Sequence, residues 1–196
     1  MSLMLGLDKC GEYLDERDED FSGEDFDYAS FSSSTFKGCS FFSSSFHSAS
    51  FIDCTFVDCN LSSCDFFSSS FTRCKFISCL FKGTLFLKIR MKDVTIERST
   101  FLYASFDNSD LKNSGIYKSK MNDGSFSDVS AKNFSIHSTN LSGTSFKGTM
   151  LSTLSLKMSE IGGILISQDA KEIRGAKLDV AQALDVARLV GVQVVE

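Results

Sequence analysis

Cysteine and histidine are the residues of this sequence whose types and spacing could do chemistry. Cys54, Cys59 and Cys64 recur with four residues between them, a spacing that suggests a metal site or disulfide bonds. The only two histidines, His47 and His137, could act as general bases. We expect no carboxylate pair, glycine-rich phosphate loop or Ser-His-Asp order around either histidine. The sequence therefore disfavours an enzyme, and the role of the cysteines depends on the elements that position them.

The composition describes a globular chain with an unusual aromatic bias. It has 196 residues, 42% of them apolar, with 20 Phe but neither Pro nor Trp. No apolar stretch reaches the roughly 18 residues that a membrane span needs, so we expect no membrane partner. The first seven residues lack the basic start of a secretory signal, which predicts a cytoplasmic protein in a reducing compartment.

A five-residue repeat dominates the sequence. From Phe21 to Ile161 every fifth residue is apolar, at 29 consecutive positions that include 17 of the 20 Phe. Neither the helical period of 3.6 nor the strand period of 2 keeps such residues on one face. Two residues before each position lies a mostly small residue, and this column holds six of the seven cysteines. Alternating large and small residues would fill the axis of a narrow coil without voids.

The repeat unit resembles that of the pentapeptide-repeat proteins. Blocks such as Ala-Ser-Phe-Ser-Ser (29–33) and Cys-Thr-Phe-Val-Asp (54–58) match that family's small-polar-Leu/Phe-polar-x unit. The resemblance implies an all-β fold, a right-handed quadrilateral β-helix with four pentapeptides per coil. Residues 20 apart would then stack at the ~4.8 Å spacing of neighbouring strands. Consecutive cysteines would point to different faces, so we expect free buried thiols rather than a metal site or disulfides.

A short helix is predicted at about residues 179–190. Asp179 and Gln182 have the spacing of a capping box, and Gly191 occupies the position of a helix C′ residue. Residues 192–195 alternate as a closing strand would. An apolar stripe on the helix could plug the end of the coil, but its extent favours self-association. The predicted dimer-interface residues are Val180, Ala183, Leu184, Ala187 and Val190.

The carboxyl tail resembles one group within that family. Residues 174–183 (RGAKLDVAQA), followed by LVGV at 189–192, are similar to the tail of the quinolone-resistance (Qnr-like) group, and the acidic stretch 19–26 resembles that group's first coil. This resemblance implies an end-to-end homodimer without a cofactor that binds type II topoisomerase, meaning DNA gyrase and topoisomerase IV. It would lower fluoroquinolone susceptibility. The alternative is a pentapeptide-repeat interaction scaffold with an unrelated partner.

Register and resemblance together divide the chain into three parts. We expect an acidic amino-terminal segment or cap at 1–20, the β-helix at 21–163, and a carboxyl-terminal cap with the dimerisation helix at 164–196. Because the repeats run from Phe21 to Ile161 without interruption, no loop is expected to project from the coils.

Charge is the remaining guide to a partner. Members of the quinolone-resistance group have been interpreted as DNA mimics, which would need about one negative charge per 1.7 Å. The net charge is −5, but residues 21–160 carry +1, so the rod is nearly neutral on average and no direct nucleic-acid binding is expected. One face would still be acidic, and Lys92, Lys112 and Lys132 would form a ladder on the next face. The predicted partner-binding residues are Asp25, Asp27, Asp65, Asp107, Asp128, Phe67 and Leu87.

Overall fold

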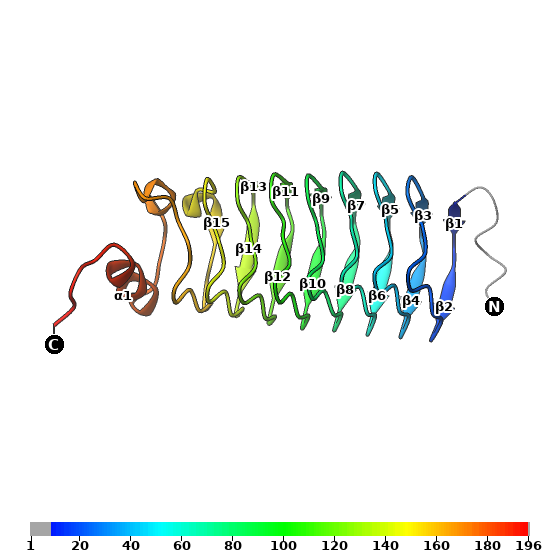
Figure 1. Cartoon of the computed structure of the whole chain (residues 1–196), viewed down its shortest axis with the longest axis horizontal. Helices are drawn as coiled ribbons and strands as arrows, with labels where there is room; N and C mark the ends of the chain where they lie inside the picture. The colour runs from blue at the N-terminus through cyan, green and yellow to red at the C-terminus, as the bar shows by residue number, and fades with distance from the viewer. Residues whose placement is uncertain (1–8, 196) are drawn as a thin grey trace.

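The computed structural model describes residues 9–195, which form a rod of stacked coils with a helix at its carboxyl end (Figure 1). Two parallel sheets run along the rod, and each strand pairs with the strand 20 residues later, as in Phe31↔Phe51 and Phe36↔Phe56. One sheet contains β1 (Cys10–Glu12), β3 (Ser30–Ser32), β5 (Ser50–Ile52), β7 (Ser70–Thr72), β9 (Arg90–Lys92), β11 (Asp110–Lys112) and β13 (Ser130–Lys132). The other contains β2 (Asp15–Arg17), β4 (Thr35–Lys37), β6 (Thr55–Val57), β8 (Lys75–Ile77), β10 (Thr95–Glu97), β12 (Gly115–Tyr117), β14 (Phe134–His137) and β15 (Leu154–Ser155).

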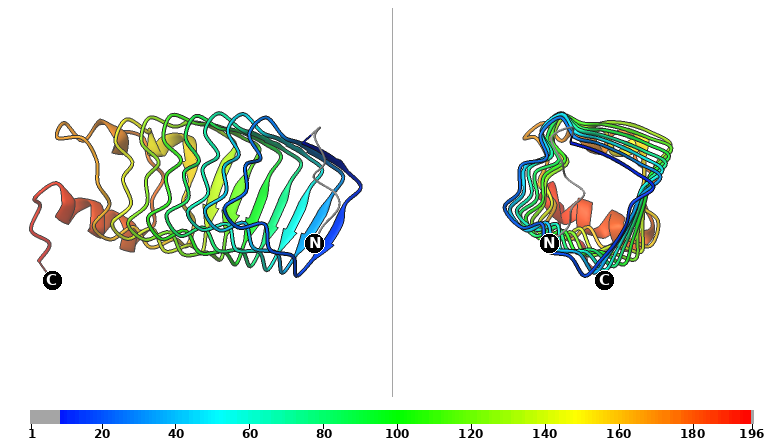
Figure 2. Two further views of the ribbon diagram at one scale, coloured as in Figure 1. Left: turned by 45° about the vertical axis from the view of Figure 1, so that its right-hand side comes forward. Right: turned by 90° about the vertical axis from the view of Figure 1, so that its right-hand side faces the viewer.

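The other two sides of each coil consist of turns joined by single parallel bridges. These bridges also step by 20 residues, from Asp20↔Ser40 and Asp25↔Ser45 to Ser145↔Leu165. Seen along its axis the rod is four-sided (Figure 2). The predicted β-helix of pentapeptide repeats with a short carboxyl-terminal helix is thus confirmed.

Strand pairing extends beyond the range 21–163 at both ends. At the amino end β1 already pairs with β3, and at the carboxyl end Leu165 still bridges Ser145. The division of the chain into three parts stays a prediction. The first eight residues, including those that argued against a secretory signal, lie outside the described residues.

The core is a set of stacked rings. Every in-register residue from Phe21 to Ile161 is buried except Ala131, which is half-buried. Rings 20 residues apart lie nearly parallel, as in Phe46 and Phe66, whose centroids are 4.7 Å apart with planes inclined by 10°. Rings that follow one another within a coil meet edge to face, as Phe31 and Phe36 do, or at a tilt, as Phe41 and Phe46 do. Each coil therefore buries its aromatic side chains against the coils before and after it.

The small residues inside the coil satisfy the backbone of the preceding coil. The Thr84 hydroxyl donates to the carbonyl of Leu61 at 2.7 Å, and the Cys64 thiol donates to that of Phe41 at 2.8 Å. Burial raises the pKa of Cys64 to about 12. All seven cysteines are free and six are buried, which confirms the prediction of packed thiols.

One coil exchanges its large and small positions. Ala131 stands where the repeat calls for a large residue, and Phe134 stands where it calls for a small one. Phe134 is buried, with its ring centroid 6.3 Å from that of Phe126. The exchange keeps the volume of the core nearly constant.

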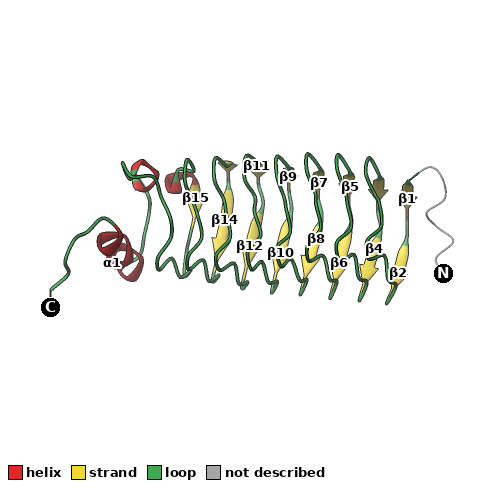
Figure 3. Cartoon of the chain, viewed as in Figure 1, coloured by secondary structure: helices red, strands yellow, loops and turns green. Residues whose placement is uncertain are grey.

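The carboxyl end of the rod is closed by irregular turns and one α-helix (Figure 3). The turns include η1 (Leu151–Thr153) and η2 (Lys171–Ile173), and the helix is α1 (Val180–Leu189). Asp179 and Gln182 form the predicted capping box, so the helix prediction is confirmed. The Gln182 side chain also donates to the carbonyls of Leu156 and Ser159, each at 2.7 Å, which fastens the helix to the last coil.

Beyond α1 the predicted closing strand is not formed. Residues 192–195 are exposed and outside any strand, and the one backbone hydrogen bond from this described segment runs from the Val192 N–H to the carbonyl of Ala187 in α1. Within residues 9–195, no helix is long and apolar enough to cross a bilayer.

A buried carboxylate holds the turns of the cap together. Glu172 accepts hydrogen bonds from the backbone N–H of Gly148 at 2.8 Å and of Ser167 at 3.2 Å, and from the Ser167 hydroxyl. Burial by itself would raise the pKa of this carboxyl. The hydrogen bonds outweigh burial and lower the pKa of Glu172 to about 2.

Candidate functional site

The predicted acidic face, comprising the five aspartates Asp25, Asp27, Asp65, Asp107 and Asp128, lies on one turn side of the rod. Asp25 and Asp65 share the bridge column that includes Ser45, and Asp27 and Asp107 stand two residues after a bridge position. Asp128 is an exposed turn residue with a left-handed φ of 53°. The structure thus places all five on the same side, but spread over six coils rather than gathered at one point.

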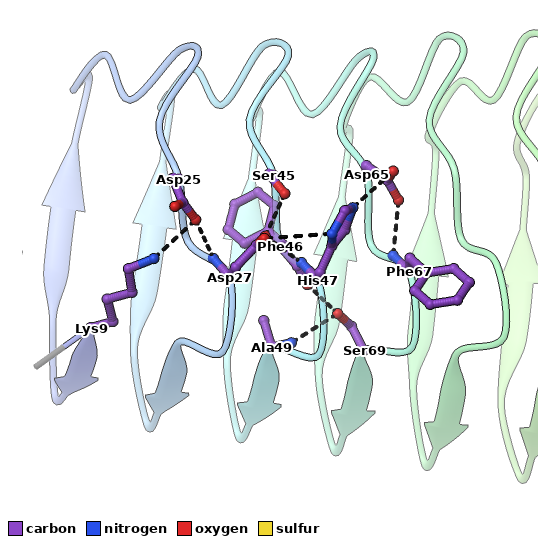
Figure 4. Close-up of polar contacts among 10 residues, drawn as sticks. All are labelled: Lys9, Asp25, Asp27, Ser45, Phe46, His47, Ala49, Asp65, Phe67 and Ser69. Carbon is purple, nitrogen blue, oxygen red and sulfur yellow. Dashed lines mark hydrogen bonds and ion pairs between the residues drawn. The ribbon is translucent and has the colours of Figure 1, made fainter.

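His47 lies between two of these carboxylates (Figure 4). Its Nε2 is 3.0 Å from Asp65 Oδ2 and its Nδ1 is 3.5 Å from Asp27 Oδ2. The hydrogen bond to Asp65, and the charges of Asp65, Asp27 and Asp25, raise the pKa of His47 despite partial burial. The expectation that no carboxylate pair surrounds this histidine is wrong, because coil stacking brings residues 18 and 20 positions away beside it.

Some of these aspartates also bind the backbone. The Asp27 carboxylate accepts the N–H of His47 at 2.8 Å, and Asp107 accepts the N–H of Ser127 at 2.8 Å. Asp25 accepts the N–H of Asp27 and pairs with Lys9 at 2.9 Å. These contacts hold the carboxylates of Asp25, Asp27 and Asp107 in place, so this part of the face presents ordered negative charges.

An apolar patch interrupts the acidic face. Phe67 is 38% exposed and the Lys88 ammonium lies 5.2 Å from its ring centroid, while Leu87 is half-buried on the next coil. Leu85, which bridges Asp65, is 37% exposed beside them. Sequence reasoning included Phe67 and Leu87 but missed Leu85. The signal was available, because Leu85 precedes an inward residue by one, an outward position in every repeat.

The predicted dimer stripe on α1 is only partly covered by the rod. Gln182 and Val186 contact the last coil, whereas Val180 is 79% exposed and Val190 is 46% exposed. Ala183 is also exposed, and Leu184 and Ala187 are half-buried. With the tail valines, these side chains give the carboxyl end an uncovered apolar surface.

Charge is segregated along the axis of the rod. Residues 9–65 carry three basic and twelve acidic side chains, a net charge of −9, whereas residues 66–161 carry thirteen basic and seven acidic ones, a net charge of +6. At about 4.8 Å per 20-residue coil, the first stretch holds roughly one net negative charge per 1.5 Å, against about one per 1.7 Å in duplex DNA. The near-neutral average therefore hides a strongly acidic amino-terminal end.

The surface around His47 combines charged and apolar side chains. Within the described part of the chain, no three His, Cys, Asp or Glu side chains are placed to hold a metal ion. His47 is held by carboxylates, and the nearby Ser45 hydroxyl is bonded to Asp27 rather than to the imidazole. The arrangement is a charged and apolar surface suited to a macromolecular partner.

Comparisons with protein-family models and with solved structures find the same repeat class and fold. Residues 29–106 match the family model described as a pentapeptide repeat region, which confirms the predicted repeat class. The structure of full-length QnrB1, a plasmid-mediated fluoroquinolone resistance protein, is 17% identical, with a TM-score of 0.50 over 93% of this chain and 100% of that chain. A trypsin-treated QnrB1 variant is 20% identical, with a TM-score of 0.48 over 93% and 99%. A search of curated proteins finds no match. At these identities the likeness to full-length QnrB1 shows the fold.

Proposed function

We propose that this protein is a cytoplasmic binding protein without catalytic activity. Its partner is type II topoisomerase, meaning DNA gyrase and topoisomerase IV, and binding lowers fluoroquinolone susceptibility. The fold shared with QnrB1 and the tail resemblance support this assignment. The observation that carries it is the acidic amino-terminal end, whose net charge per unit length is close to that of duplex DNA. A surface that binds DNA phosphates would attract this end of the rod.

Neutralising acidic residues should weaken topoisomerase binding according to their place along the rod. We expect Asp25→Asn with Asp65→Asn to weaken binding of purified gyrase about tenfold at low salt, since both lie in the acidic end. Adding salt should shrink the difference, because the Debye length falls to about 10 Å at 0.1 M. Binding measured over a salt series, with a supercoiling assay with and without drug, checks this.

The matched control removes the same number of charges from the same face. The double change Asp107→Asn with Asp128→Asn lies in the basic stretch and should weaken gyrase binding less. The triple change Asp65→Asn, Asp107→Asn and Asp128→Asn should combine the losses of affinity. Equal binding of all these variants across the salt series would refute electrostatic mimicry. Failure of the wild type to bind gyrase would favour the alternative, an interaction scaffold whose partner contacts the apolar patch of Phe67, Leu85 and Leu87.

The uncovered stripe on α1 supports a homodimer joined end to end. Leu184→Asp would place charges in an apolar interface across a two-fold axis, so we expect a monomer with an intact rod. Ala181→Asp adds the same charge off the stripe and should remain dimeric. Light scattering distinguishes the species, and a wild-type monomer at micromolar concentration would contradict the proposal.

A further inference from the structure

Three lysines form a column of like charges on the seven-stranded sheet. Strand register pairs Lys92 with Lys112 and Lys112 with Lys132, and all three side chains are exposed. Neighbouring rungs are about 4.8 Å apart, so the column extends over about 10 Å. Arg90, at the other end of β9, projects from the same sheet. We call these four residues the basic ladder.

The basic ladder has few acidic partners of its own. Lys112 pairs with Asp110 at 2.7 Å, but no carboxylate within residues 9–195 lies within ion-pair distance of Arg90, Lys92 or Lys132. By contrast, Arg73, on the coil before β9, is matched by Asp53 at 2.7 Å. Like charges directly opposite one another destabilise a sheet. The ladder therefore carries a repulsion that a bound polyanion would relieve.

A surface depression and the positive charge of the surrounding stretch both favour binding of an anion at the basic ladder. A shallow depression of about 350 Å³ lies between β7, β9 and β11, lined by Arg90, Lys92 and Lys112 together with Asp110 and neighbouring hydroxyls. The ladder lies within the stretch 66–161, which carries a net charge of +6. An anion would thus meet both the local cations and the favourable field of this half of the rod.

We propose that the basic ladder binds the phosphate backbone of duplex DNA. Successive phosphates of one strand are about 3.4 Å apart along the duplex axis, so a ladder of about 10 Å spans about four of them. Contacts to phosphates carry no sequence information, so binding is independent of sequence. This replaces the expectation of no direct nucleic-acid binding, which rested on the average charge of the rod. The proposal does not depend on topoisomerase binding.

The test is binding of a fluorescein-labelled duplex of about 30 base pairs to the purified full chain, by fluorescence anisotropy over a salt series. Four phosphate contacts predict that affinity falls about 150-fold between 50 mM and 200 mM salt. The triple change Lys92→Gln, Lys112→Gln and Lys132→Gln should remove about three of these contacts. The affinity of this variant should then fall only roughly 3- to 4-fold over the same salt range. Thermal unfolding should show this variant to be at least as stable as the wild type.

The control removes three exposed lysines from another side of the rod, through Lys75→Gln, Lys118→Gln and Lys157→Gln. This variant has the same net charge as the ladder variant and should keep the steep salt dependence. An equal loss of duplex affinity in the two variants would overturn the proposal, as would the absence of duplex binding by the wild type at 50 mM salt. Competition by poly-glutamate as effective as that by unlabelled duplex would also overturn it, since the ladder would then be a surface for acidic proteins. The ladder variant should still bind gyrase, so the two proposals fail separately.

Discussion

Phe71→Ala is expected to destabilise the rod by about 3–5 kcal/mol. The Phe71 ring is 1% exposed and stacks on that of Phe51, with centroids 5.0 Å apart and planes inclined by 6°. It also meets Phe66 edge to face at 5.4 Å. Alanine would open a cavity that neighbouring rungs cannot fill, because hydrogen bonds on all four sides fix the spacing of the coils. Denaturant unfolding of the purified variant measures the loss.

The matched control is Phe42→Ala, which deletes the same ring from the outside of the rod. Phe42 is 47% exposed, and we expect a loss of at most about 0.5 kcal/mol. Equal losses for the two variants would show that inward and outward positions are wrongly assigned. In the same unfolding experiment, all seven cysteines should react with a thiol reagent without prior reduction, because all are free.

Glu172→Gln is expected to destabilise the carboxyl-terminal cap by about 2–3 kcal/mol at pH 7. The amide cannot accept all three hydrogen bonds from Gly148 and Ser167, so buried donors lose their partner. In a solenoid each coil contacts only its neighbours, so the effect should be confined to the cap and the last coils. Hydrogen exchange of the Gly148 and Ser167 amides measures it.

The pH dependence of the wild type gives the same prediction a second readout. Folding lowers the pKa of Glu172 from 4.5 to about 2. The ionised carboxylate therefore makes its full contribution to the stability of the folded state above pH 4.5, and this contribution is lost as the pH falls towards 2. The difference between the wild type and Glu172→Gln should therefore shrink over this interval. Glu160→Gln, at an exposed carboxylate bonded to Asn140, should have little effect at either pH. A constant difference from pH 7 to pH 2 would contradict the assigned role.

The interior of the rod could be predicted from the sequence because its packing rule is local. Each repeat supplies one large and one small inward residue, so the period of five alone identifies the buried positions from Phe21 to Ile161. The capping box of Asp179 and Gln182 was predictable for the same reason, since its partners are three residues apart. Four repeats per coil came from the family resemblance, and this number decides which residues become neighbours.

Everything that depends on contacts between coils needed the tertiary structure. His47 meets Asp27 and Asp65, and Glu172 meets Gly148, only because the chain returns to the same side after each coil. The average charge of the rod concealed an acidic end and a basic stretch, both of which appear when the charges are counted over shorter ranges of the sequence. The sequence determined which side chains face inward, because burial follows the repeat. The tertiary structure decided which outward charges stand together, because stacking places residues about 20 positions apart within one rung of each other.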